Sequence, residues 1–165
     1  MSKAIRDQKE AQVEKIKKML ENAKAFVIID YKGLNVAEDT NLRNSYRKNG
    51  VSYHVLKNTL LKIALNELGY KDFDKYMEGT SSLAVSIDDV VAPSKVSAQK
   101  MAEFKKMKIK CGMVDGKFLT ENECMELSKL PSKEVLIAQL LSMLLAPISS
   151  FARAIDAIAK QQESN

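Results

Sequence analysis

The feature that most constrains the fold is the order of short β-type runs and amphipathic segments. Four runs are apolar or alternate in the manner of strands, at residues 25–30, 51–56, 83–87 and 109–113. Segments with helical spacing of apolar residues surround them, at residues 3–22, 36–48, 58–68, 93–104 and 121–128. The chain therefore contains two strand–helix–strand units joined by an additional helix. This order predicts an α+β fold of the split βαβ (ferredoxin-like) kind with extra helices, mainly on one face of a mixed or antiparallel sheet. A doubly wound parallel sheet is the alternative.

Capping signals define where three of these helices begin. Asn35 precedes Glu38 by three residues, and Thr120 precedes Glu123 by the same spacing, which in both cases predicts a capping box. Asn58 is predicted to cap the helix that follows the second strand.

The last 35 residues differ from the rest in composition and pattern. Pro131 and the residue after it interrupt the chain and start a helix, and Pro147 is predicted to start a second one. Apolar residues of this second helix fall on one arc of its surface: Ile148, Phe151, Ala152, Ile155, Ile158 and Ala159. We therefore expect a globular domain over residues 1–130 and a C-terminal helical spine over residues 131–165. The interrupted apolar run at 135–148 is expected to be too short to span a bilayer.

Positive charge is concentrated in the first third of the chain. The net charge is +5, and residues 1–62 hold 13 Lys/Arg against 7 Asp/Glu, whereas residues 131–165 hold three of each. A concentrated positive surface attracts polyanions by releasing their counterions. The N-terminus has no apolar region of the secretory kind, so we expect a cytoplasmic protein.

Motifs of catalysis and of cofactor or metal binding are absent from the sequence. The six glycines form no phosphate-binding loop, and the lone His54 has no nucleophile motif beside it. Cys111 and Cys124 have poor zinc spacing and are interpreted as apolar side chains. An enzyme centred on His54 is therefore the weakest functional hypothesis, and no cofactor or metal is expected.

A set of basic and donor-rich residues follows the first two strands and occupies the intervening helix. Its members are Tyr31, Lys32, Gly33, Arg43, Arg47, Lys57, Asn58, Thr59 and Lys62. Arg43 and Arg47 share a helix face, and Lys57 begins a helix whose free N–H groups suit a phosphate. With an exposed aromatic ring at Tyr31, this set predicts a surface for structured RNA.

The same segments resemble the bacterial large-subunit ribosomal protein ten family, the base of the ribosomal stalk. The pieces that carry the resemblance are collinear over nearly the whole chain: Tyr31–Leu34, Leu42–Gly50, Val55–Leu61, Gly79–Ala84 and Leu130–Pro131. One departure is Gly79–Ser82, where other members often carry proline, which leaves the shape of this loop open.

The resemblance implies a function that composition does not show. Such proteins bind large-subunit ribosomal RNA beside ribosomal protein eleven, and they have no enzymatic activity. Their C-terminal helix carries dimers of the acidic stalk protein seven/twelve, which recruit translational GTPases. The segment from Pro147 to Gln162 is about 24 Å long as a helix, so two dimers are expected here. The remaining alternative is a free nucleic-acid-binding regulator that dimerises through the C-terminal helix.

Overall fold

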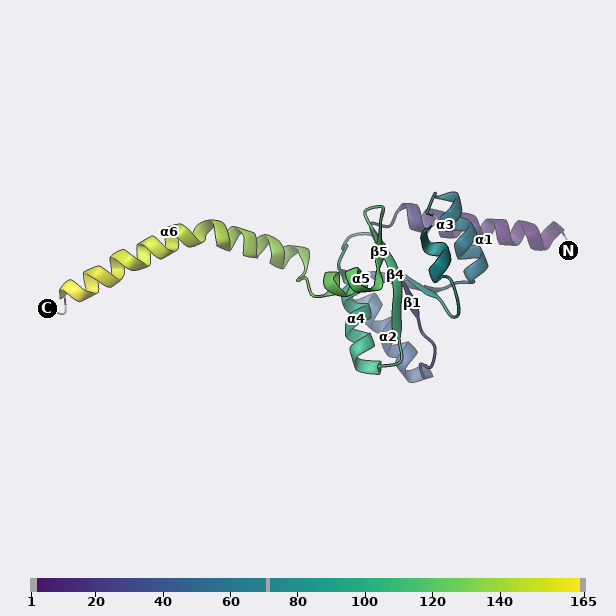
Figure 1. Ribbon diagram of the computed structural model, residues 1–165, viewed down its shortest axis with the longest axis horizontal. Helices are drawn as coiled ribbons and strands as arrows, with labels where there is room; N and C mark the ends of the chain where they lie inside the picture. Colours follow the sequence, from purple (N-terminus) through teal and green to yellow (C-terminus); the bar gives the residue numbers. More distant parts are fainter. Residues whose placement is uncertain (1–2, 71, 164–165) are drawn as a thin grey trace. The chain divides into compact units, whose positions relative to one another are not determined.

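The computed structural model describes the backbone of residues 3–70 and 72–163 (Figure 1). Side chains are described for residues 9–157, residue 71 excepted, and for Lys160. The chain divides into two compact units, Met1–Leu130 and Pro131–Asn165.

A five-stranded sheet organises the first unit. Its strands are β1 (Ala25–Asp30), β2 (Val51–Val55), β3 (Ser82–Ser86), β4 (Lys108–Val114) and β5 (Lys117–Thr120). They lie in the order β2-β3-β1-β4-β5, and every neighbouring pair is antiparallel. β1 and β2 both run antiparallel to β3, so they are parallel to each other with β3 between them. This is the split βαβ arrangement, which confirms the predicted fold class and excludes the doubly wound parallel sheet.

The fifth strand was not predicted. It pairs with β4 through the turn at Asp115 and Gly116, whose φ angles of 47° and 81° are both positive. Two-residue hairpin turns of this kind match the twist of the strands that they join.

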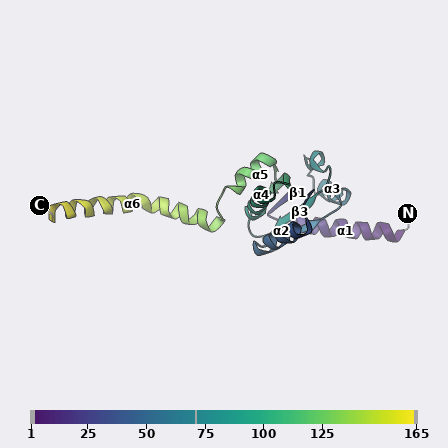
Figure 2. The ribbon, with the colours of Figure 1, turned by 90° about the horizontal axis from the view of Figure 1, so that it is seen from below.

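Helices cover both faces of the sheet, so the expectation that they lie mainly on one face is wrong (Figure 1). The helical segments of this unit are α1 (Lys3–Glu21), α2 (Val36–Lys48), α3 (Asn58–Glu67), the 3₁₀ segment η1 (Asp72–Tyr76), α4 (Ala92–Phe104) and α5 (Glu121–Ser128). Residues of α1, α3 and η1 pack on one face, and residues of α2, α4 and α5 pack on the other. The view in Figure 2, turned by 90°, shows the same helices from below. The physical reason lies in β1, which is apolar at successive positions and therefore presents an apolar surface to both sides.

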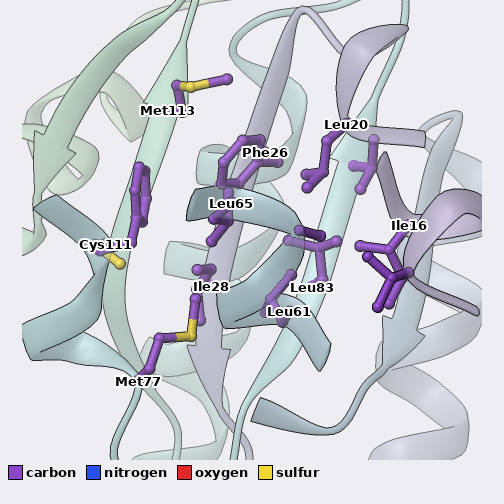
Figure 3. Packing of buried hydrophobic residues seen from close by; sticks show 14 residues of the cluster. Ile16, Leu20, Phe26, Ile28, Leu61, Leu65, Met77, Leu83, Cys111 and Met113 are labelled. Atoms are coloured by element: carbon purple, nitrogen blue, oxygen red, sulfur yellow. The ribbon is translucent and has the colours of Figure 1, made fainter. Parts of the chain in front are cut away.

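The core on the first face is built from β1, α1 and α3 (Figure 3). Phe26 and Ile28 of β1 meet Leu61 and Leu65 of α3, and all four side chains are buried. Ile16 joins them from α1. Each large side chain buried in this way contributes roughly 1.5–3 kcal/mol before entropy costs.

Tyr46 holds α2 against the second face. Its hydroxyl lies 2.7 Å from the Ser97 Oγ of α4, and its ring stacks on Tyr53 of β2 at 5.2 Å between centroids. Burial raises the pKa of the Tyr46 hydroxyl. The buried hydrogen bond connects α2 to α4, and the stacked rings connect α2 to β2.

A β-bulge interrupts the pairing of β4 with β1. Ile28 pairs with Cys111 and Ile29 pairs with Ile109, so Lys110 is the extra residue. The bulge sends Ile109 to the second core and Cys111 to the first, although simple alternation would place them on one face.

Both predicted capping boxes are confirmed. The Asn35 side chain accepts a hydrogen bond from Val36 N at 2.7 Å, and Asn35 N donates to Glu38 Oε2 at 2.7 Å. That backbone hydrogen bond, and a hydrogen bond from the side chain of Lys106, lower the pKa of Glu38.

The second unit contains one continuous helix, α6 (Lys133–Glu163), which includes Pro147 in its interior. The expectation that Pro147 starts a separate helix is therefore wrong. A proline inside a helix removes one N–H donor, here the partner of the Met143 carbonyl. Because Met143 is exposed, water can satisfy that carbonyl, and the helix continues.

The continuity of α6 also corrects the expectation about bilayer length. The stretch Lys133–Ala157 is long and apolar enough to cross a membrane, judged by length and composition only. A single helix of this kind is weak evidence for a membrane span. What α6 shows directly is that its described apolar side chains are exposed within the structure.

Candidate functional site

The strand order brings distant parts of the predicted RNA-binding set together. The carboxyl ends of the parallel strands β1 and β2 lie beside the amino end of β3. There Tyr31, Lys57, Asn58 and Thr59 line one shallow depression with Leu56 and Gly79–Ser81, and we call it the sheet-end hollow. Residues that are far apart in sequence thus form a single surface.

A tight turn after β1 exposes Lys32 beside this hollow. Leu34 N donates to the Tyr31 carbonyl at 3.3 Å, and Lys32 N donates to Asp30 Oδ1 at 3.1 Å. Gly33 has a φ of +88°, a conformation that side chains with a Cβ rarely adopt. Asp30 also accepts from the Thr80 hydroxyl, so one carboxylate connects the turn to the opposite wall of the hollow.

Asn58 shapes the hollow but does not cap α3, so that expectation is wrong. Lys57 occupies the N-cap position without a side-chain hydrogen bond, and Asn58 is the first helical residue. Its amide donates instead to the carbonyls of Met77 and Gly79, at 3.1 Å and 2.6 Å. Tertiary hydrogen bonds to the 77–79 segment replaced the local cap, and sequence alone does not show them.

Lys110 is a residue of this region that sequence reasoning missed. The bulge in β4 directs its ammonium group to the Glu78 carbonyl at 2.6 Å, the Thr80 carbonyl and the Ser81 hydroxyl at 3.0 Å. The Gly79–Ser81 wall is therefore held from three sides, by Asn58, Asp30 and Lys110. A lysine between the apolar residues Ile109 and Cys111 was the one available signal.

Arg43 and Arg47 line a separate hollow on α2, together with Val51–His54 of β2. Arg43 Nε donates to Asp39 Oδ2 at 2.8 Å, and its guanidinium lies 5.0 Å from the centre of the Tyr53 ring. The hydrogen bond that Arg43 donates to Asp39 raises the pKa of Arg43, and Tyr31 adds a smaller contribution. Arg43 is therefore held in place, and its charge is partly compensated.

Lys62 is not brought into either hollow. It lies one turn inside α3 and pairs with Asp74 of η1, with 3.3 Å between Nζ and Oδ1. A compensated lysine at this position is a weaker candidate for a phosphate contact than Lys57.

The predicted docking stripe on α6 is exposed where it is described. Ile148 and Phe151 are each 69% exposed, Ile155 is 50% exposed, and Ala152 is exposed as well. The side chains of Ile158 and Ala159 lie outside the described residues. The structure adds a second exposed apolar group on the same helix that the predicted stripe left out: Val135, Leu136, Ile137, Leu140, Leu141, Met143, Leu144 and Leu145.

The two units match the two regions of one known family. The family described as "Ribosomal protein L10" matches residues 4–105, and "Ribosomal protein uL10 C-terminal region" matches residues 130–165.

Similar full-length relatives carry the name "Large ribosomal subunit protein uL10". The protein of Clostridioides difficile (strain 630) is 46% identical over 164 residues, covering 99% of this chain and 97% of the relative. That of Staphylococcus epidermidis (strain ATCC 12228 / FDA PCI 1200) is 39% identical over 162 residues, covering 98% of each. That of Clostridium acetobutylicum is 40% identical over 159 residues, covering 96% of this chain and 95% of the relative.

These matches show what class of protein this is: a structural protein of the cytoplasmic ribosome without enzymatic activity. This class rules out the enzyme hypothesis centred on His54. The chain belongs to the uL10 family, whose members are stalk-base proteins of the large ribosomal subunit. The resemblance stated from the sequence is thereby confirmed.

Proposed function

We propose that the two units divide the work of a stalk base. Residues 1–130 bind large-subunit ribosomal RNA beside ribosomal protein eleven. Residues 131–165 carry two dimers of the acidic stalk protein seven/twelve, which recruit translational GTPases.

The sheet-end hollow supports the RNA assignment. Lys57, Thr59 and Tyr31, which carry an ammonium group, a hydroxyl and an aromatic ring, line this one concave surface. No side chain caps the start of α3, so its first N–H groups remain suited to a phosphate oxygen. Cations, donors and an aromatic ring together are the usual means of holding RNA backbone and unstacked bases.

The exposed apolar surface of α6 is the observation that carries the docking assignment. Monomeric soluble proteins rarely expose a contiguous apolar area of this kind, and such areas mark interaction sites. Residues 131–165 have no net charge, so hydrophobic burial must supply most of the affinity.

The length of α6 and the position of Pro147 support two docking segments. The helix has 31 residues, which corresponds to about 46 Å. Exposed apolar residues occur on both sides of Pro147, which lies near the middle of the helix. The sequence alone predicts both dimers on the segment from Pro147 to Gln162. Because apolar residues are also exposed before Pro147, we instead assign one dimer to that earlier segment and one to the segment around Ile148–Ile155.

Native mass spectrometry with the acidic protein tests the docking assignment. The full chain should carry four copies, a chain ending at Ala146 two, and a chain ending at Leu130 none. Phe151→Asp should remove one dimer, because a charge enters an apolar interface, whereas Arg153→Ala on the opposite side of α6 serves as the control. Capture by the chain ending at Leu130 would refute the assignment.

Salt titration tests the RNA assignment. Replacing both Arg43 and Arg47 by alanine should lower the slope of log affinity against log salt by roughly 1 to 2 if each contacts a phosphate. The control replaces Lys95 and Lys129, two exposed lysines outside both hollows, and should leave the slope unchanged. An arginine variant that behaves like the control contradicts the assignment.

A further inference from the structure

Edge strand β2 is surrounded by three hollows that meet at one residue. The arginine hollow lies on its α2 side, and two more lie on its α1 side. His54 lines all three of them. β2 pairs only with β3, so its other edge carries backbone N–H and C=O groups that have no partner within the sheet.

The charged residues that line these hollows have one sign, and Arg43 among them is paired with Asp39 of the same helix. Lys15 and Lys18 of α1 line the hollows on one side, and Arg43 and Arg47 line the hollow on the other. No Asp or Glu is among the described residues that line any of the three. A concave surface whose charged lining residues are all basic attracts a polyanion.

The surface is continuous with the sheet-end hollow through Lys57, which lines both that hollow and one of the two on the α1 side. Partly exposed apolar side chains lie between the cations: Met19, Val55 and Ile87. Ribose and unstacked base faces pack on such surfaces, while the backbone of an edge strand can bond to polar groups of the nucleotide.

We propose that ribosomal RNA follows the edge of β2, and that Lys15, Lys18 and His54 contact it in addition to the residues predicted from sequence. This inference rests on the proposed RNA-binding function and extends it from the α2 face around the sheet edge to α1. RNA is the occupant that the charges and the continuity favour over an acidic peptide added to the strand edge.

The experiment compares three double variants, one of them the arginine pair Arg43 and Arg47, and one single variant of the full chain. Each is tested in complex with the acidic stalk protein for binding to a large-subunit RNA fragment. Lys15→Ala with Lys18→Ala should lower the salt slope by about 1.4 to 1.8. His54→Ala in a separate variant should weaken binding, because His54 lines all three hollows. Lys95→Ala with Lys129→Ala is the matched control.

The possible outcomes distinguish a failure of this inference from a failure of the proposed RNA-binding function. If Arg43→Ala with Arg47→Ala lowers the slope but the Lys15 and Lys18 variant matches the control, RNA does not follow the edge. If neither pair changes binding, the RNA assignment itself fails. If the Lys15 and Lys18 variant binds RNA normally but no longer binds an acidic peptide, the edge of β2 binds a peptide rather than RNA, and the inference is overturned.

Discussion

Replacing Lys110 by methionine tests how the shape of the sheet-end hollow, rather than its charge, contributes to RNA binding. The substitution keeps most of the side-chain stem and removes the ammonium group that holds Glu78, Thr80 and Ser81. A hydrogen bond to a charged group contributes about 1.5–3 kcal/mol. Because water can replace the ammonium at the exposed Glu78, we expect a total loss of about 2–3 kcal/mol rather than the sum.

This loss should appear in RNA affinity because the loop must then be ordered on binding. At about 1.4 kcal/mol per tenfold, affinity falls by roughly 30-fold to 150-fold. The salt slope should stay unchanged, since the ammonium of Lys110 faces protein oxygens rather than a phosphate. Lys57→Met should instead lower the slope by about 0.7–0.9, because Lys57 is exposed at the rim of the hollow.

The assay is a salt titration of RNA binding, paired with hydrogen exchange of the amides in the 78–81 loop. Lys110→Met should accelerate exchange there, and Lys57→Met should not. Lys110→Arg keeps the charge but changes the donor geometry, so an intermediate affinity is expected. A Lys110→Met variant that lowers the slope by about one, with unchanged exchange, would show that Lys110 is itself an RNA contact.

Three further outcomes are expected. Gly112→Ala should destabilise the fold by about 1–3 kcal/mol in urea titrations, because a Cβ there would lie 2.9 Å from Cys124 Sγ and 3.1 Å from the Phe26 carbonyl oxygen. Adding Cys124→Ala should recover part of that loss. Strict additivity of the two changes in unfolding free energy would contradict the contact. Burial raises the pKa of Cys111 and of Cys124 to about 12, so iodoacetamide at pH 8 should modify neither thiol in the native chain and both in denaturant. The same thiols ionise first in the unfolded chain, so their stabilising contribution should be complete below about pH 9 and should fall as the pH rises toward 12, as measured by urea midpoints against pH.

The sequence predicted what local chemistry determines. Asn35 and Thr120 cap their helices as expected because each capping box closes within four residues. Tyr31 and Lys57–Thr59 line one hollow because the two strands that precede them end at the same edge of the sheet.

Features that depend on tertiary partners were missed. β5 has four residues and little burial of its own, and it exists as a strand by pairing with β4. The amide of Asn58 finds its carbonyl partners about twenty positions along the chain, so the local capping rule failed. Pro147 stays within α6, although the local rule for proline predicts a break.

The exposed apolar surface of α6 affects how much of the protein stays free of aggregation. A helix without packing partners is only marginally stable in water, and the described part of α6 buries none of its large apolar side chains. If the proposed docking on α6 holds, chains made in excess of the acidic stalk protein would therefore self-associate. The usable amount of this protein would then follow the amount of its partner, which couples the production of two ribosomal components through solubility alone.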